Sequence, residues 1–63
     1  MNKTNILKEL KGLWNCTKLV NGKMIRRQCW AKNQWQIVDS LDFDKANIIA
    51  EYFYQTDLAK ALI

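Results

Sequence analysis

Residues 13–30 read LWNCTKLVNGKMIRRQCW, two runs rich in apolar and strand-favouring residues on either side of Asn21-Gly22. Asn-Gly between such runs is the strongest short-range signal for a β-hairpin, because both residues tolerate the positive φ angles of a primed turn. This stretch therefore predicts two antiparallel strands joined by a tight turn.

Two registers are compatible with this hairpin. A two-residue turn places Lys18 opposite Ile25. A three-residue loop with a bulge at the glycine instead places Leu19 opposite Ile25 and Trp14 opposite Trp30. We favour the bulged register, because it pairs large apolar residues across the strands more consistently.

The segments next to the hairpin predict a helix and a third strand. Thr4 is placed to cap a short helix that runs to Lys11, and Gly12 follows as its stop. Residues 31–34 make a second tight connection, and residues 35–38 begin with the alternating polarity of a strand. We therefore expect a three-stranded antiparallel sheet.

The last third of the chain has the pattern of a helix. Ser40 or Asp42 can accept hydrogen bonds from its first amides, and Asp44 suits the positive end of its dipole. The face expected to pack on the sheet carries Ala46, Ile49, Ala50 and Phe53, with Phe43 at its edge. Thr56-Asp57 predicts a break before a short terminal helix over residues 58–63. The expected fold is a single α+β domain over residues 1–63, in the order α-β-β-β-α.

Length and composition favour a small globular protein. With 63 residues and 49% hydrophobic residues, the chain lies near the lower size at which a core is stable without a metal, a disulfide or a partner. No apolar run approaches the length of a membrane span, and the N-terminus mixes lysines with apolar residues, so we expect a cytoplasmic protein. Cys16 and Cys29 are expected to be small buried apolar side chains, with a disulfide as the alternative. Without histidine or a Cys-x-x-Cys pair, we expect no metal and no cofactor.

The charge is strongly asymmetric along the chain. Residues 1–36 hold eight basic and one acidic side chain, whereas residues 37–63 hold two basic and five acidic ones. We expect the basic residues of the hairpin region to lie near its outer end and to contact nucleic acid, DNA rather than RNA: Lys18, Lys23, Arg26, Arg27 and Lys32. Two alternatives are a solvated strand face that blocks edge pairing and a surface for an acidic protein.

Apolar and aromatic residues outside this set suggest further contacts. Trp14, Trp30 and Trp35 are expected to build the core, with at most one of them free to stack on bases. Ile48 and Tyr52 fall on the side of the predicted C-terminal helix away from the sheet. They are expected to be covered by the first helix or the tail, or to bind a partner or a second copy.

Nothing in the chain favours catalysis. It has no histidine, no nucleophile motif and no glycine-rich loop, and the only acidic cluster, Asp39, Asp42 and Asp44, is best explained as a helix cap. The protein is therefore expected to act by binding, as a monomer or weak homodimer, and to have no membrane partner.

Three families share this layout. The stretch Trp14 to Phe53 is similar to the three-stranded arm-binding domains of phage-type integrases, a resemblance that implies insertion of a sheet into DNA. The layout also resembles small phage anti-defence proteins such as some anti-CRISPR inhibitors, which implies an inhibitor or adaptor that binds protein. It resembles double-stranded RNA-binding domains in outline, but Asp42-Phe43-Asp44-Lys45 lacks the basic cluster of that family.

Overall fold

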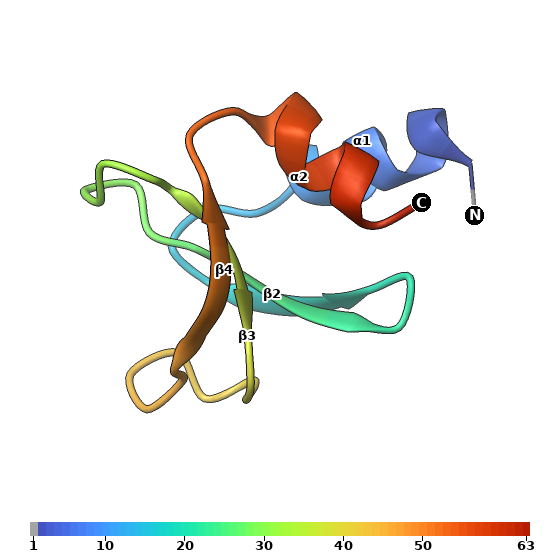
Figure 1. Cartoon of the computed structure of the whole chain (residues 1–63). Coiled ribbons are helices and arrows are strands. Elements are labelled where there is room, and N and C mark those ends of the chain that lie inside the picture. Colours follow the sequence, from blue (N-terminus) through green and yellow to red (C-terminus); the bar gives the residue numbers. More distant parts are fainter. Residues whose placement is uncertain (1) are drawn as a thin grey trace.

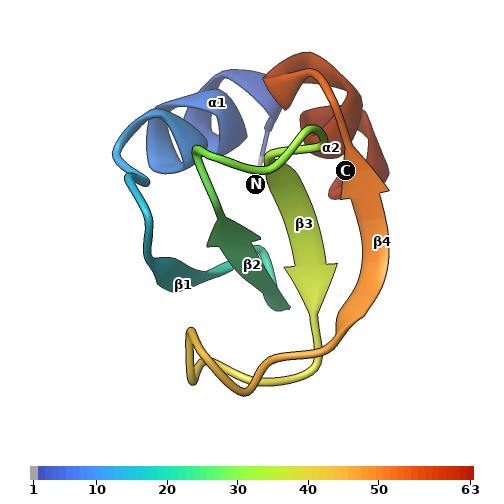
Figure 2. The same ribbon diagram turned by 90° about the vertical axis from the view of Figure 1, so that its left-hand side faces the viewer.

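The computed structural model describes residues 2–63 and has two helices and four strands. In chain order these are α1 Lys3–Lys11, β1 Thr17–Val20, β2 Lys23–Arg27, β3 Trp35–Val38, β4 Ile48–Tyr52 and α2 Gln55–Ala61. The strands form one antiparallel sheet in the order β1-β2-β3-β4, so each strand pairs with its neighbour in sequence (Figure 2). The α+β class is confirmed, but the sheet has four strands and not the predicted three.

The turn between β1 and β2 has two residues. Asn21 has φ 49° and Gly22 has φ 81°, the left-handed pair that a primed turn requires. Lys18 lies opposite Ile25, and Leu19 lies opposite Met24. The favoured bulged register is therefore wrong, because the primed turn already matches the right-handed twist of the strands.

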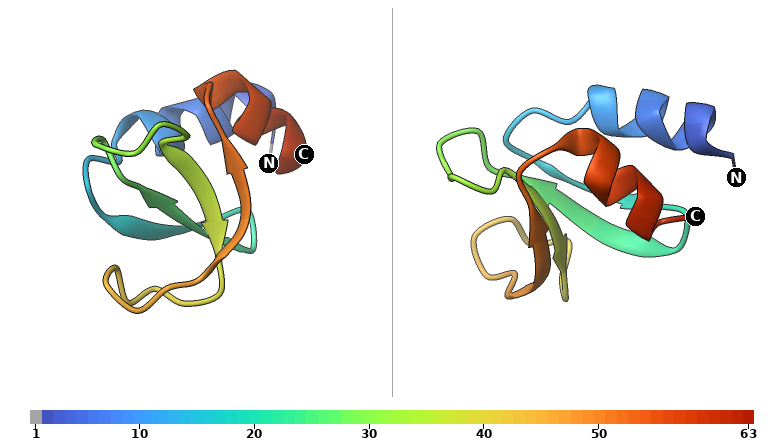
Figure 3. Two further views of the ribbon diagram at one scale, coloured as in Figure 1. Left: turned by 60° about the vertical axis from the view of Figure 1, so that its left-hand side comes forward. Right: turned by 45° about the horizontal axis from the view of Figure 1, so that its top comes forward.

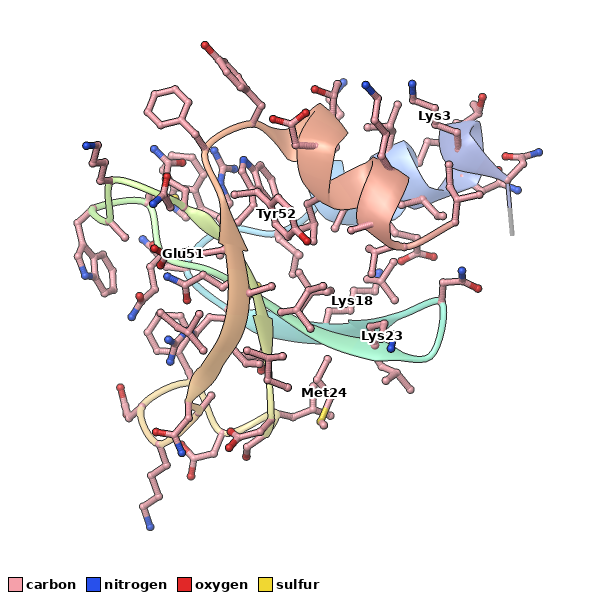
Figure 4. All side chains as sticks on the ribbon, in the orientation of Figure 1. Lys3, Lys18, Lys23, Met24, Glu51 and Tyr52 are labelled. Atoms are coloured by element: carbon pink, nitrogen blue, oxygen red, sulfur yellow. The ribbon has the colours of Figure 1, made fainter. Side chains whose placement is uncertain are left out.

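This register sorts the sheet's side chains onto two sides. Side chains alternate along a strand, so Val20, Ile25, Trp35 and Ile37 point to the side covered by the helices, which we call the helix side. The opposite side, the loop side, carries the connection of residues 39–47 between β3 and β4 (Figure 3). Figure 4 shows Tyr52 pointing from β4 toward the helices, and Met24 pointing away from them.

The core lies between the helix side and the two helices, which pack side by side (Figure 1). Its buried members from outside the sheet are Ile6, Leu10, Leu13, Leu58, Ala59 and Leu62. Gln55 ties the helices together, because its Nε2 donates to the Leu7 carbonyl at 3.0 Å. Neither α1 nor α2 is long and apolar enough to cross a membrane.

α1 forms where the sequence predicts it, with one change at its start. Asn2 caps the helix instead of Thr4, because the Asn2 side chain accepts a hydrogen bond from the Asn5 backbone N–H at 2.9 Å. Gly12 follows the last helical residue as predicted.

The predicted C-terminal helix from residue 40 or 42 is wrong. Residues 39–47 form a connection with turns, and Ile48–Tyr52 form the edge strand β4. The β-branched pair Ile48-Ile49 and the aromatic Tyr52 favour a pleated strand, and pairing with β3 outweighs the helical spacing of Ala46, Ile49, Ala50 and Phe53. A short terminal helix does form, but it spans Gln55–Ala61, so the predicted break at Thr56-Asp57 is wrong and both residues lie in the first turn of the helix.

Candidate functional site

Arg26 is a structural residue and not a free surface cation. Its side chain is 5% exposed, and its Nε donates to Gln36 Oε1 at 2.7 Å. Its Nη1 donates to the carbonyls of Phe43 at 2.7 Å and Ala46 at 3.1 Å, and its guanidinium lies 5.7 Å from the Phe43 ring centroid. Arg26 thus holds residues 39–47 against the loop side of the sheet, so the expectation that it lies free at the outer end of the hairpin is wrong.

Arg27 is half-buried on the helix side. Its guanidinium carbon lies 5.1 Å from the Trp14 ring centroid and 4.4 Å from that of Trp35. It donates to the Leu13 carbonyl at 3.0 Å and to Gln34 Oε1 at 3.3 Å. Because β2 ends at Arg27, this fixed cation lies at the end of the sheet opposite the Asn21-Gly22 turn, and not near the outer end of the hairpin as expected.

The three predicted lysines are exposed but do not gather into one patch. Lys18 forms an ion pair with Glu9 of α1. Lys23 lies directly after the turn, whereas Lys32 lies in the β2–β3 connection at the other end of the sheet (Figure 4 labels Lys18 and Lys23). α1 carries three further exposed lysines that the sequence prediction did not include, Lys3, Lys8 and Lys11.

Four exposed aromatic side chains lie at one end of the sheet. Trp14 and Trp30 are each 69% exposed, Phe53 is 56% exposed and Tyr54 is 62% exposed. They belong to the α1–β1, β2–β3 and β4–α2 connections, which the order of the antiparallel strands brings to the same end. We call these four residues, with Arg27 and Lys32, the aromatic end. The prediction that at most one tryptophan is free is wrong, since only Trp35 is buried.

The connections that carry these rings are tied to one another. The Cys29 backbone N–H donates to Asn15 Oδ1 at 2.7 Å, which joins the segments of Trp14 and Trp30. Asn33 Nδ2 donates to Glu51 Oε1 at 3.1 Å, which joins the β2–β3 connection to β4. These two hydrogen bonds hold the connections of the aromatic end in place relative to one another and to β4.

The rings point to different sides of this end. Trp14 contacts Arg27 on the helix side. Trp30 meets Phe43 on the loop side, with ring centroids 5.9 Å apart and planes at 67°. Phe53 and Tyr54 pack edge to face at 4.8 Å beyond the end of β4. The aromatic end is thus a row of separate contacts around the rim of the sheet.

No family model, curated protein or solved structure matches this chain. The functional argument therefore depends on the geometry of its own residues.

The acidic cluster shapes the β3–β4 connection. Asp39 accepts hydrogen bonds from the Asn47 backbone N–H at 2.8 Å and from its side chain at 3.2 Å, and these bonds hold the Asp39 pKa below its ordinary value. Asp42 Oδ1 accepts from the backbone N–H groups of Asp44 and Lys45. The acids thus close turns instead of capping the predicted helix. Within residues 2–63, no three His, Cys, Asp or Glu side chains are grouped so that they could hold a metal ion.

The two predicted partner contacts, Ile48 and Tyr52, point to opposite sides of β4. Ile48 lies opposite Val38 and is exposed. Tyr52 lies opposite Trp35 and packs partly against the core. Only Ile48 of the two is therefore an exposed apolar side chain.

Both cysteines are free and half-buried, and Cys16 also contacts the core.

Proposed function

We propose that the protein is a non-catalytic module that binds single-stranded nucleic acid with its aromatic end. The observation that supports this is the gathering of Trp14, Trp30, Phe53 and Tyr54, all more than half exposed, beside Arg27 and Lys32. Sequence-tolerant binding of single strands combines rings that stack on bases with cations that contact phosphates.

The exposure of these rings is costly in so small a protein. Burial of one aromatic side chain removes about 150–250 Å² from water, the largest apolar contribution that a residue makes to a core. Two of the three tryptophans nevertheless lie outside the core. Large exposed aromatic side chains next to an arginine are typical of binding surfaces.

A single strand suits this surface better than a duplex. The duplex hypothesis needed Arg26 free on a β-ribbon, but all the hydrogen bonds of Arg26 described above go to Gln36 and to residues of the 39–47 connection. The rim of a four-stranded sheet is about 14 Å across, since neighbouring strands lie about 4.8 Å apart. Rings spread along this rim can contact successive unpaired bases, whereas stacked bases of a duplex are closed to them.

Charge supports the same proposal. The chain has a formal net charge of +4, and exposed lysines lie on α1, after the hairpin turn and in the β2–β3 connection. Such a field draws polyanions to the protein and strengthens as the salt concentration falls.

The test is fluorescence anisotropy with labelled single-stranded DNA, single-stranded RNA and duplex DNA at about 50 mM and 200 mM salt. We expect single strands to bind more tightly than the duplex, with weaker binding at the higher salt concentration. Trp30→Ala should weaken binding roughly five- to 150-fold, the range expected for loss of one stacked base. Ile63→Ala is the matched control, because Ile63 is equally exposed at 69% and lies at the C-terminus.

Two results would contradict the proposal. One is the absence of binding at low salt, and the other is unchanged affinity when Trp14 and Trp30 are both replaced by alanine in a protein with the wild-type circular dichroism spectrum. A stoichiometric protein partner that resists nuclease and is lost in the same double variant would favour the inhibitor or adaptor function instead.

A further inference from the structure

A second surface lies on the loop side of the sheet, toward the Asn21-Gly22 turn. Leu19 and Met24 face each other across β1 and β2, and Ile48 lies opposite Val38 across β4 and β3. Continuing the β2–β3 register from Ile25 and Ile37 places Met24 beside Val38. One apolar row therefore crosses all four strands: its two outer members, Leu19 and Ile48, are exposed, whereas Met24 is half-buried and Val38 is buried.

Two further apolar side chains widen this row. Ile49 is the extra residue of a β-bulge in β4, because Ile37 and Val38 pair with Ala50 and Ile48, and it is exposed. Leu41 is exposed in the β3–β4 connection, where its carbonyl accepts a hydrogen bond from the Thr17 hydroxyl on β1. We call Leu19, Met24, Leu41, Ile48 and Ile49 the apolar patch.

The rim of the apolar patch is acidic. Asp39, Asp42 and Asp44 are exposed in the 39–47 connection, and Glu51 is exposed on the loop side of β4 opposite Gln36. Lys45 is the one basic side chain between residues 38 and 52. This sign of charge repels nucleic acid and opposes pairing of the patch with the same patch of a second copy.

We infer that the apolar patch binds a basic amphipathic segment of another protein, with apolar residues on the patch and lysine or arginine against its acidic rim. Exposed apolar residues framed by polar ones mark interaction sites, and charge of opposite sign selects the partner. The inference does not depend on nucleic-acid binding. It adds a protein contact on the loop side of the sheet, which adjoins the aromatic end at the contact of Trp30 with Phe43.

The probe is a synthetic amphipathic helical peptide built from leucine and lysine, titrated into the isotope-labelled protein and followed by NMR. We expect the largest shifts at the amides of Leu19, Met24, Leu41, Ile48 and Ile49. A peptide with glutamate in place of lysine should not bind.

Substitutions in and around the apolar patch distinguish binding of the peptide at the patch from nonspecific attraction between charges. Leu19→Ser and Ile48→Ser should each weaken peptide binding about fivefold, because part of each side chain would be buried on binding. Asp44→Asn, which removes a rim charge, should weaken binding at low salt and have little effect at high salt. Ile63→Ser is the control, since it removes an exposed isoleucine outside the patch.

Three outcomes would overturn the inference: shifts confined to the aromatic end, equal binding of the glutamate peptide, or a dimer in solution that dissociates in Ile48→Ser. The Ile48→Ser variant should keep its affinity for single strands, and Trp14→Ala, which changes a ring on the helix side, should keep its affinity for the peptide. These variants therefore show which of the two proposals is wrong, binding of single strands or binding of the peptide.

Discussion

Replacing Arg26 by alanine is expected to free the β3–β4 connection and to remove much of the protein's stability. The substitution deletes the donors that serve Gln36 Oε1 and the Phe43 and Ala46 carbonyls. It also removes the guanidinium group from the Phe43 ring. These contacts are the main attachment of residues 39–47 to β2.

The expected loss is about 3–4 kcal/mol. A hydrogen bond to a charged group contributes about 1.5–3 kcal/mol, but the carbonyls of Phe43 and Ala46 regain water when the connection opens, so the three contributions do not add in full. Gln36 is 1% exposed, and its unpaired Oε1 carries most of the remaining cost. A domain of this size has a total stability of roughly 3–9 kcal/mol, so the variant should be close to unfolding.

Urea unfolding followed by tryptophan fluorescence measures this loss. Arg26→Met keeps much of the side-chain volume without the donors, and it separates hydrogen bonding from packing. Lys23→Ala, an exposed change on the same strand, should stay within about 0.5 kcal/mol of the wild type. Hydrogen exchange at the Asn47 amide, which donates to Asp39, should become faster in Arg26→Ala. An unfolding free energy within about 0.5 kcal/mol of the wild type in Arg26→Ala would refute this account of the connection.

Two further predictions concern pH and the hairpin turn. The depressed pKa of Asp39 means that its carboxylate stabilises the fold at neutral pH, and that this contribution is lost as the pH falls below about 4 and through the depressed value. Melting temperatures from pH 2 to 7 should therefore fall less steeply at the acid end in Asp39→Asn, and parallel curves would contradict this. Gly22→Ala should lower the unfolding free energy by about 1 kcal/mol, because φ is 81° there and nothing lies within 4 Å of the added Cβ. Gly12→Ala is its control, since φ is −76° and the new Cβ would lie at an ordinary 3.7 Å from the Glu9 carbonyl, so stability should be unchanged or slightly raised.

Local patterns predict the order of the elements in the first half of the fold. The Asn21-Gly22 turn, the stop at Gly12 and the alternation after Trp35 act through neighbouring residues, so α1 and three strands form in the predicted segments. The strands β1 and β2 are nevertheless shorter than residues 13–20 and 23–30, and they pair in the register that was not favoured. For residues 42–53 the sequence predicts a helix where the structure has a connection and a strand, because the apolar residues of this segment fit both a helical face and a strand. The free edge of β3 decides between them, and no local pattern reports that edge.

The candidate site could not be predicted from local patterns, because it depends on contacts between residues far apart in the sequence. Arg26 and Arg27 are adjacent in a basic run, yet alternation sends one under the 39–47 connection and the other between two tryptophans. The burial of Arg26 is set by carbonyls 17 and 20 residues away, which a hairpin pattern does not include. Trp14 and Trp30 lie beyond the ends of β1 and β2, so they were not paired as the bulged register required.

The order of the strands also has a kinetic consequence. Because every strand pairs with its neighbour in sequence, each hairpin closes only a short loop, and the sheet can form quickly from local contacts. The packing of α1 against α2 joins segments 48 residues apart, as the bond from Gln55 to Leu7 shows. Completion of the core therefore waits for both ends of the chain, and removal of either helix would open the apolar side of the sheet to water.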